Sequence, residues 1–325
     1  MAHEAKDPMR NAPVAPSPAH MAPKAAIVIV TYNRPDFLKG LLESIAALAV
    51  KPGYVIVVDN NSREPTRQIL AQFQQETLGF TLLVKRLDKN IGGAGGFSVG
   101  VEEALKTDAD WFWLMDDDVV VLPDGLEKML RWTDRFRCFH AGRQDSDGSH
   151  FFCEQWVSNA LAVQLPFLKE PYRGRDYFLT NYGCFEGMMI HRDIVGKIGL
   201  PDRRFFIVWD DAIYGWLAAR ETEVAFIADE CLQKVRRQRQ ISLGLRHLND
   251  ASDLSRYYAM RNRALIKGYF KAKGVYVPLA FELGSCLVFL KEVVRMVMVE
   301  RSLKGMWSLI RGVTGKGYRS GKIGD

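Results

Sequence analysis

Three consecutive aspartates at the end of an apolar run are the feature of the sequence best suited to chemistry. Residues 111–118 read Trp-Phe-Trp-Leu-Met-Asp-Asp-Asp. In an extended chain alternate side chains point to opposite sides, so Asp116 and Asp118 would share one side and Asp117 would take the other. Two carboxylates at this spacing suit a hard divalent cation that takes its remaining oxygens from a substrate phosphate. On its own, the triplet could equally be a solvated acidic turn.

A second aromatic run, at residues 205–211, also ends in carboxylates, Asp210 and Asp211. Helical spacing follows, and two carboxylates at a helix start could simply serve the helix dipole. The functional interpretation makes one of them a general base, because a neighbouring carboxylate and aromatic rings raise its pKa towards a useful range. Three aromatic residues could offer a face to a sugar ring or pack in the core instead: Trp209, Tyr182 and Trp156.

The elements that must position these groups alternate between strand-like and helix-like patterns. Continuous apolar runs predict buried strands, and the stretches between them have helical spacing. This alternation predicts an α/β fold with a mostly parallel, doubly wound sheet, which binds ligands beyond the carboxyl ends of its strands. Polar clusters follow four strand ends, at residues 31–33, 59–61, 90–93 and 116–118. Further on, the polar stretch 140–149 is expected to be a loop.

The polar residues at these strand ends are candidates for contacts with a nucleotide. Asp59 and Asn61 could bond a base or ribose, or cap a helix. Arg34 could contact a pyrophosphate or lie on the surface. The segment 90–97 is neither a P-loop nor G-x-G-x-x-G, but its glycines could admit a ligand or open a helix towards a phosphate. A glycine-packed turn is the alternative. The candidates are Thr31, Asn33, Arg34, Asp59, Asn61, Asn90, Gly92, Gly93 and Asp117.

Composition limits the class of protein. With 48% hydrophobic residues in 325, the chain has ample core. Five cysteines without a C-x-x-C pair argue against zinc and against a secreted disulfide framework. We expect a disordered Ala/Pro-rich tail at residues 1–24, one large domain at 25–270, and a helical, basic region at 271–325. The sequence contains no uninterrupted run of 18 apolar residues, so we expect no membrane-spanning helix.

The C-terminal end is basic and apolar at once. Residues 291–325 carry eight Lys/Arg against three Asp/Glu, together with many apolar side chains and Trp307. Such a segment is typical of an element lying on a membrane surface, and an amphipathic helix packed on the core is the alternative. Nucleic acid is not an expected partner, because the basic residues are not interleaved with aromatics on a binding module.

The chain resembles the family 2 nucleotide-sugar glycosyltransferases, and within them the bacterial galactofuranosyltransferases of cell-wall galactan synthesis. The resemblance spans roughly residues 25–270. The acidic segment marks only the broad family, whereas Asn-Ile-Gly-Gly-Ala-Gly-Gly-Phe points to the galactofuranosyl branch. The family resemblance is carried by residues 31–35, 57–60, 90–97, 113–118, 206–211 and 257–263.

The resemblance implies a GT-A fold with a helical C-terminal extension. It implies Mn²⁺ or Mg²⁺ held by Asp116 and Asp118 on the diphosphate of a UDP-sugar donor. Asp211 would deprotonate the acceptor hydroxyl, Asp210 would help to bind the acceptor, and the anomeric carbon would be inverted. The expected acceptor is a lipid-linked glycan. The protein is expected in the cytoplasm, peripherally bound at the inner face of the plasma membrane. A homo-oligomer is possible.

The chain departs from the family pattern at two places. A Glu often follows the second acidic pair, where this chain has Ile213 and Tyr214. A histidine commonly follows on the next strand as a metal or phosphate ligand, but residues 228–236 hold none, and Gln233 or Lys234 falls nearest. His247, further along, is our candidate for the third metal ligand, with a solvated loop histidine as the alternative.

Competing functions stay open at this point. Within the same class, the chain could be a rhamnosyltransferase that uses a dTDP-sugar, because this fold changes sugars through pocket details. From other classes, it could be a non-catalytic nucleotide-sugar-binding subunit or a redox enzyme with a dinucleotide on the same sheet. Binding of NAD would favour the redox enzyme.

Overall fold

The structure is a computed structural model that describes residues 23–167, 172–235, 241–242, 247–248 and 252–317. Nearly all of the expected N-terminal tail at residues 1–24 lies outside these ranges. The backbone of His247 lies in the short strand β13 (His247–Leu248), paired with β12 (Ile241–Ser242), but its side chain is outside the described part.

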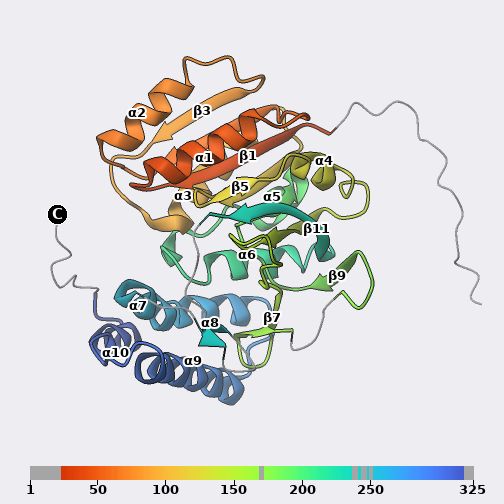
Figure 1. Cartoon of the computed structure of the whole chain (residues 1–325). Coiled ribbons are helices and arrows are strands. Elements are labelled where there is room, and N and C mark those ends of the chain that lie inside the picture. Colours follow the sequence, from red (N-terminus) through yellow and green to blue (C-terminus); the bar gives the residue numbers. More distant parts are fainter. Residues whose placement is uncertain (1–22, 168–171, 236–240, 243–246, 249–251, 318–325) are drawn as a thin grey trace, which may run out of the picture.

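A mixed sheet, nine-stranded within the described residues, forms the centre of the molecule (Figure 1). Its first four strands are parallel, in the order β3-β2-β1-β4, which confirms the predicted α/β fold. They are β1 (Ala25–Thr31), β2 (Tyr54–Asp59), β3 (Thr81–Arg86) and β4 (Trp111–Asp116). Beyond β4 come β10 (Met188–His191), β6 (Cys138–Gln144), β11 (Val224–Lys234) and β5 (Val119–Val121), with β9 (Tyr177–Thr180) also paired to β11.

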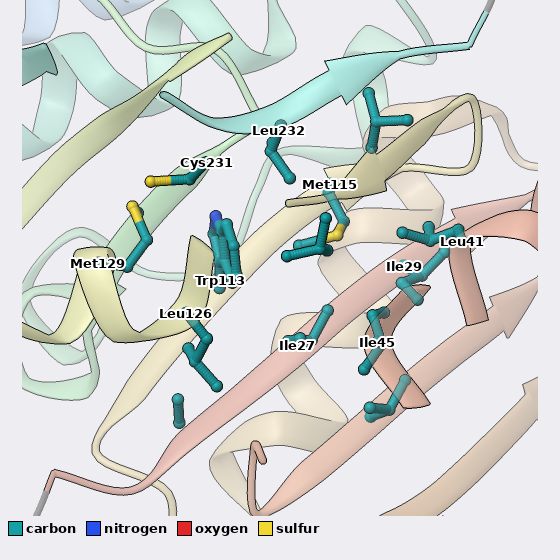
Figure 2. Packing of buried hydrophobic residues seen from close by; sticks show 14 of the residues in the cluster. Ile27, Ile29, Leu41, Ile45, Trp113, Met115, Leu126, Met129, Cys231 and Leu232 are labelled. Carbon is teal, nitrogen blue, oxygen red and sulfur yellow. The ribbon is translucent and has the colours of Figure 1, made fainter. Parts of the chain in front are cut away.

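Helices cover both faces of this sheet, because the parallel strands are apolar on both sides. In β1, Ile27 and Ile29 face one layer, whereas Ala26 and Val28 face the other. The first layer contains α1 (Pro35–Ala46), α2 (Glu64–Phe73) and α4 (Gly125–Leu130), and the second contains α3 (Gly92–Leu105), α5 (Arg192–Ile198) and α6 (Asp210–Ala218). Figure 2 shows the first layer packed around Trp113. Each large buried side chain there contributes about 1.5–3 kcal/mol.

The C-terminal helices gather at one end of the molecule, away from β3 and α2 (Figure 1). They are α7 (Asp253–Arg261), α8 (Arg263–Ala272), α9 (Pro278–Met298) and α10 (Met306–Thr314). Met260, Met296 and Leu309 form a small core there with Val163 of the hairpin β7 (Gln155–Ser158)–β8 (Val163–Pro166). The predicted domain boundary at residue 270 falls inside α8 and remains a prediction. None of the described helices combines the length and apolarity needed to cross a membrane.

The prediction of a loop at residues 140–149 was wrong for residues 140–144, which belong to β6. This polar strand lies inside the sheet, between β10 and β11. It is tolerated there because its buried side chains have partners. Nδ1 of His140 lies 3.2 Å from the carbonyl oxygen of Ala225, and Arg143 pairs with Glu186. Burial lowers the pKa of His140 to about 3, so its ring is neutral.

Candidate active site

The carboxyl ends of the parallel strands bring the predicted polar residues together. Thr31 at the end of β1 is in register with Asp59 of β2, and Val30 is in register with Asp116 of β4. The segments that follow these strands therefore share one edge of the sheet, as the parallel topology requires.

Asp117 bonds to two residues near the end of β1. One of its carboxylate oxygens accepts a hydrogen bond from Thr31 Oγ1 at 2.7 Å, and the other accepts one from Arg34 Nη1 at 2.9 Å. Arg34 Nη1 also lies 3.5 Å from Asp118. Residues 117–118 form a turn rather than the extended strand on which the predicted division of the three carboxylates rested, so that division remains a prediction.

Asp116 and Asp118 meet a third carboxylate, Glu186. One oxygen of each lies within 4.8 Å of the others, a grouping that could hold a metal ion. Glu186 was not predicted from the sequence. It comes two residues before β10, and its position beside β4 is fixed by the bond from the Gly187 amide to the Leu114 carbonyl, 2.9 Å. Three carboxylate ligands fit a hard cation such as Mg²⁺ or Mn²⁺, which takes further oxygens from water or phosphate.

The electrostatics of this cluster leave it short of positive charge. Burial, followed by the charges of Glu186 and Asp118, raises the pKa of Asp116 well above its usual range. Burial also acts to raise the pKa of Glu186, but the Arg143 and Lys234 cations outweigh it and lower that pKa. Among the described side chains, four carboxylates (Asp116, Asp117, Asp118, Glu186) face three cations (Arg34, Arg143, Lys234).

Lys234 occupies the end of β11, close to where the family pattern places a histidine. Its Nζ lies 3.1 and 3.0 Å from the two oxygens of Glu186. Burial acts to lower the pKa of Lys234, but the Glu186 carboxylate outweighs it and raises that pKa. A protonated amine has no lone pair for a metal, so Lys234 supplies charge and cannot act as a ligand. The proposed role of His247 as the third ligand is not tested, because its side chain lies outside the described part.

Asp59 and Asn61 form a bonded rim with an unpredicted residue, Arg86. Asp59 accepts bonds from the Ser62 amide (2.7 Å) and from Arg86 Nη1 (2.9 Å). Nη2 of Arg86 donates to Asn61 Oδ1 at 3.2 Å. Ser62 Oγ in turn accepts a bond from the Asn33 amide at 2.9 Å, which ties the loop after β1 to the loop after β2. Asp59 is therefore a turn-forming residue, while Asn33 and Asn61 are exposed.

The glycine-rich segment packs directly against the loop that leads to the second acidic pair. Asn90 Oδ1 accepts a bond from the Gly92 amide, 2.8 Å, where α3 begins. Gly92 has φ +78°, and a Cβ there would lie 2.2 Å from the carbonyl oxygen of Phe206. A Cβ at Gly93 would still be 3.9 Å from Asp210, so space remains beside that carboxylate. The glycines thus let the start of α3 pack closely against the loop that leads to Asp210.

The loop before Asp210 is strained and is held by one asparagine. Phe206, Val208 and Trp209 all have positive φ, at 65°, 67° and 75°, which is costly for side chains of this size. The side-chain amide of Asn262 donates to the carbonyls of Phe205 (3.1 Å), Ile207 (2.9 Å) and Val208 (2.8 Å). Asn262 is fully buried, and sequence analysis did not single out this role.

Asp210 and Asp211 begin α6, and both have raised pKa values. Burial raises the pKa of Asp211 to about 6, although the Ala212 amide, which donates to it at 2.7 Å, and the charge of Arg143 act in the other direction. Burial and then the Asp211 charge raise the pKa of Asp210 well above its usual range. A carboxylate with a pKa near neutrality can accept a proton from a hydroxyl group.

The three aromatic candidates have different surroundings. Trp209 and Tyr182 are buried in one cluster with Phe226, so their rings are largely enclosed. Trp156 lies on β7 and is 40% exposed. Their roles in acceptor binding remain predictions.

Comparisons with known proteins show which family the sequence matches. The model of the family described as glycosyl transferase family 2 matches residues 26–199. Galactofuranosyltransferase GlfT1 of Mycobacterium tuberculosis is 40% identical over 198 residues, 57% of this chain and 60% of that protein. GlfT1 of Mycolicibacterium smegmatis is 38% identical over 196 residues, 57% and 61% of the two chains. The match thus spans about 60% of the length of these relatives.

Two solved structures share the fold. The structure of GalNAc-T7 with UDP, GalNAc and Mn²⁺ has a TM-score of 0.58 at 13% identity and covers 77% of this chain and 49% of that one. The structure of Staphylococcus aureus TarS 1–349 in complex with UDP-GlcNAc has a TM-score of 0.53 at 14% identity. The match covers 90% of this chain and 80% of that one. At these identities, the likeness establishes the fold alone.

Proposed function

This chain belongs to glycosyl transferase family 2 and has the GT-A fold, and from that premise we propose that it transfers galactofuranose from UDP-galactofuranose to a lipid-linked glycan. The similarity to two mycobacterial galactofuranosyltransferases supports this donor. The observation that carries the proposal is that Arg143 links two acidic groups. It pairs with Glu186 of the carboxylate grouping at the sheet edge, and its charge acts on Asp211 at the start of α6.

We assign the first acidic group to the donor. Asp116, Asp118 and Glu186 would hold Mn²⁺ or Mg²⁺, which, when bound, supplies Lewis-acid stabilisation of charge on the leaving diphosphate. Arg34 and Lys234 add fixed positive charge next to the same carboxylates. Such preorganised charge stabilises the transition state more than the ground state, because charge on the leaving group grows during the reaction.

A group of polar side chains lies at the ends of β1, β2 and β3, beside the carboxylate cluster: Asn33, Asn61 and Arg86. Asn33 and Asn61 are exposed, and Arg86 is held towards Asp59 and Asn61. We assign this rim to the uracil and ribose of the donor, with Thr31 and Asp117 fixing Arg34 behind it.

Asp211 is the proposed base for an inverting displacement. It would take the proton from the acceptor hydroxyl as that oxygen attacks the anomeric carbon and UDP departs. Asp210, beside it, would bind the acceptor, while burial keeps the pKa of Asp211 raised. Asn262 acts as a positioning residue, because it holds the carbonyls of the loop that precedes both aspartates.

The acceptor side of the proposal includes a membrane surface. Leu279, Leu290 and Trp307 on α9 and α10 are exposed, with Trp307 at 72%. Arg301 and Lys304 lie between these two helices. Exposed apolar side chains beside basic ones are what an anionic membrane surface binds. We therefore place the enzyme at the inner face of the plasma membrane as a peripheral protein.

Product analysis tests the proposed function. Wild-type protein is incubated with UDP-galactofuranose, Mn²⁺ and a lipid-linked glycan, and galactofuranosyl product and UDP are quantified. The expected result is metal-dependent product, lost in Asp211→Asn while UDP binding persists. If product forms with dTDP-rhamnose as donor but not with UDP-galactofuranose, the proposed donor is wrong. Full activity of Asp211→Asn would overturn the assignment of Asp211 as the base.

A further inference from the structure

A cavity of about 300 Å³ lies beside the loop that leads into the proposed base. Val208 and Trp209 of that loop form part of its wall, and Asp210 and Asp211 come next in the chain. The remaining wall comes from the hairpin strand β8 and from helices α7 and α9. The cavity therefore joins the candidate active site to the C-terminal helices.

The wall of the cavity includes a charged group of residues on α9 that contains an unsatisfied donor. Glu292 is buried, with both oxygens held by Arg295 Nη1 at 2.7 and 2.5 Å and with Lys291 Nζ 3.4 Å from Oε1. All three residues line the cavity, so two cations face one carboxylate there. The Nε atom of Arg295 is buried and has no hydrogen-bond partner within the described ranges. A buried donor without a partner is unfavourable, and phosphate oxygens are strong acceptors for a guanidinium group.

The wall of the cavity also includes apolar residues, one of which continues onto the surface. Leu287 lines the cavity and is 44% exposed, so the cavity reaches the surface at this residue. Leu283, Leu290 and Val294 are also exposed on α9, at the three- and four-residue spacing that places side chains on neighbouring turns. An exposed apolar stripe thus leads along α9 to the cavity mouth.

We propose that this cavity binds the phosphate-bearing part of an amphiphilic acceptor, in which a phosphate joins an apolar chain to a glycan. The apolar chain lies along the α9 stripe, the phosphate contacts Arg295 and Lys291, and the glycan extends past Trp209. This assignment rests on the proposed function and adds to it the site that recognises the acceptor. Trp156, opposite Leu165 on the β7–β8 hairpin, shares a face with a cavity-lining residue and is exposed for contact with the glycan.

Binding of small probes tests the chemistry of the cavity. Farnesyl diphosphate, inorganic pyrophosphate and farnesol are titrated into the full chain by calorimetry, without divalent cations so that the acidic cluster does not retain the anions through a metal. Farnesyl diphosphate is expected to bind at least about tenfold more tightly than either of the others, because each lacks one of the two recognised parts. Equal binding of pyrophosphate would reduce the cavity to an anion site, and absence of farnesyl diphosphate binding would overturn the proposal.

Variants place the binding in this cavity. Ala259→Leu adds volume at a buried lining position, and Lys291→Gln removes one cation while Arg295 still holds Glu292. Each is expected to weaken farnesyl diphosphate binding about tenfold. Ala272→Leu and Lys271→Gln, on the exposed end of α8, are the size-matched and charge-matched controls and should bind as wild type does. Unchanged affinity in both cavity variants would contradict the proposal.

Stabilisation by UDP with Mn²⁺ is measured on the same variants and separates the two hypotheses. If wild type and cavity variants all respond to UDP, their folding and donor site are intact, and loss of farnesyl diphosphate binding reports on the cavity alone. If wild type shows no response to UDP but binds farnesyl diphosphate, the proposed function fails while the amphiphile site stands.

Discussion

The ammonium group of Lys234 lies 3.0 Å from Oε2 of Glu186, inside the acidic cluster at the carboxyl edge of the sheet. The pair joins β11 to the segment before β10, and Arg143 contacts the same carboxylate from β6. Three elements beyond the first four strands thus contribute to the proposed metal site. The positive charge of Lys234 stands close to where a family histidine would ligate the metal, so here metal binding and charge compensation are separate tasks.

This arrangement predicts opposite effects for the two members of the pair. Lys234→Met removes a neighbouring positive charge and should bind Mn²⁺ about tenfold more tightly, while UDP binding in the presence of Mn²⁺ weakens. Glu186→Gln removes a ligand and should weaken Mn²⁺ binding at least about tenfold. Mn²⁺ affinity is measured by electron paramagnetic resonance, with exposed Glu102→Gln as the control.

Breaking the ion pair also affects stability, which must be measured separately. Removing one member of a buried pair costs about 3–5 kcal/mol, so the free energy of unfolding of both variants is measured in denaturant. Weaker Mn²⁺ binding in folded Lys234→Met would contradict the assignment of Lys234 to charge compensation.

The rate of transfer should depend on pH through Asp211. Its pKa of about 6 means that it is protonated, and unable to act as a base, in more acidic solution. At saturating Mn²⁺, kcat/KM should therefore rise as pH increases through about 6 and level off above it. Burial is what raises this pKa, so Asp210→Asn, which keeps the group buried, should leave the midpoint near 6. A midpoint that moves to clearly lower pH in Asp210→Asn would show that the Asp210 charge, and not burial, sets it.

Asn262 should matter for the reaction more than for donor binding. Asn262→Leu leaves the carbonyls of Phe205, Ile207 and Val208 without their donor, and the strained loop before Asp210 loses its support. We expect a loss of about 1–3 kcal/mol in the free energy of unfolding and a larger relative loss in kcat than in UDP affinity. An unchanged kcat in Asn262→Leu would contradict the role of Asn262 in positioning the loop before Asp210. Asn159→Leu, which loses a bond to Trp216 elsewhere, is the control.

The exposed face of the C-terminal helices should bind anionic membranes. Trp307→Ser removes a large exposed side chain from α10 and should reduce partition onto phosphatidylglycerol-containing vesicles about tenfold. Partition should also fall with added salt, because Lys and Arg contribute electrostatic attraction. Val50→Ser, an exposed apolar position after α1, is the control. Equal partition of wild type and Trp307→Ser would count against this face.

Local sequence patterns predicted the parts of the site that strand ends determine. Asp116, Asp118 and Asp59 follow apolar strands, and the parallel topology then brings such ends to one edge. Glu186 could not be found this way, because its role comes from tertiary packing and no local pattern marks it. Asn262 lies in the segment 257–263 that carries the family resemblance, but its contacts with the loop before Asp210 also come from tertiary packing. The strand β6 was missed for a related reason. Its polar residues are satisfied by distant partners, which an isolated hydropathy pattern does not reveal.

Thermal stability in the presence of UDP, dTDP or NAD, each with and without Mn²⁺, tests the central claim most directly. A ligand at about a hundred times its dissociation constant stabilises a protein by about 2.7 kcal/mol. We expect UDP to stabilise wild type only with Mn²⁺, and we expect the double variant with Asp116→Asn and Asp118→Asn to lose this effect. Stabilisation by dTDP in place of UDP would point to a different donor. Stabilisation by NAD alone, or by none of the three, would contradict the assignment of this site to a metal-dependent UDP-sugar transferase.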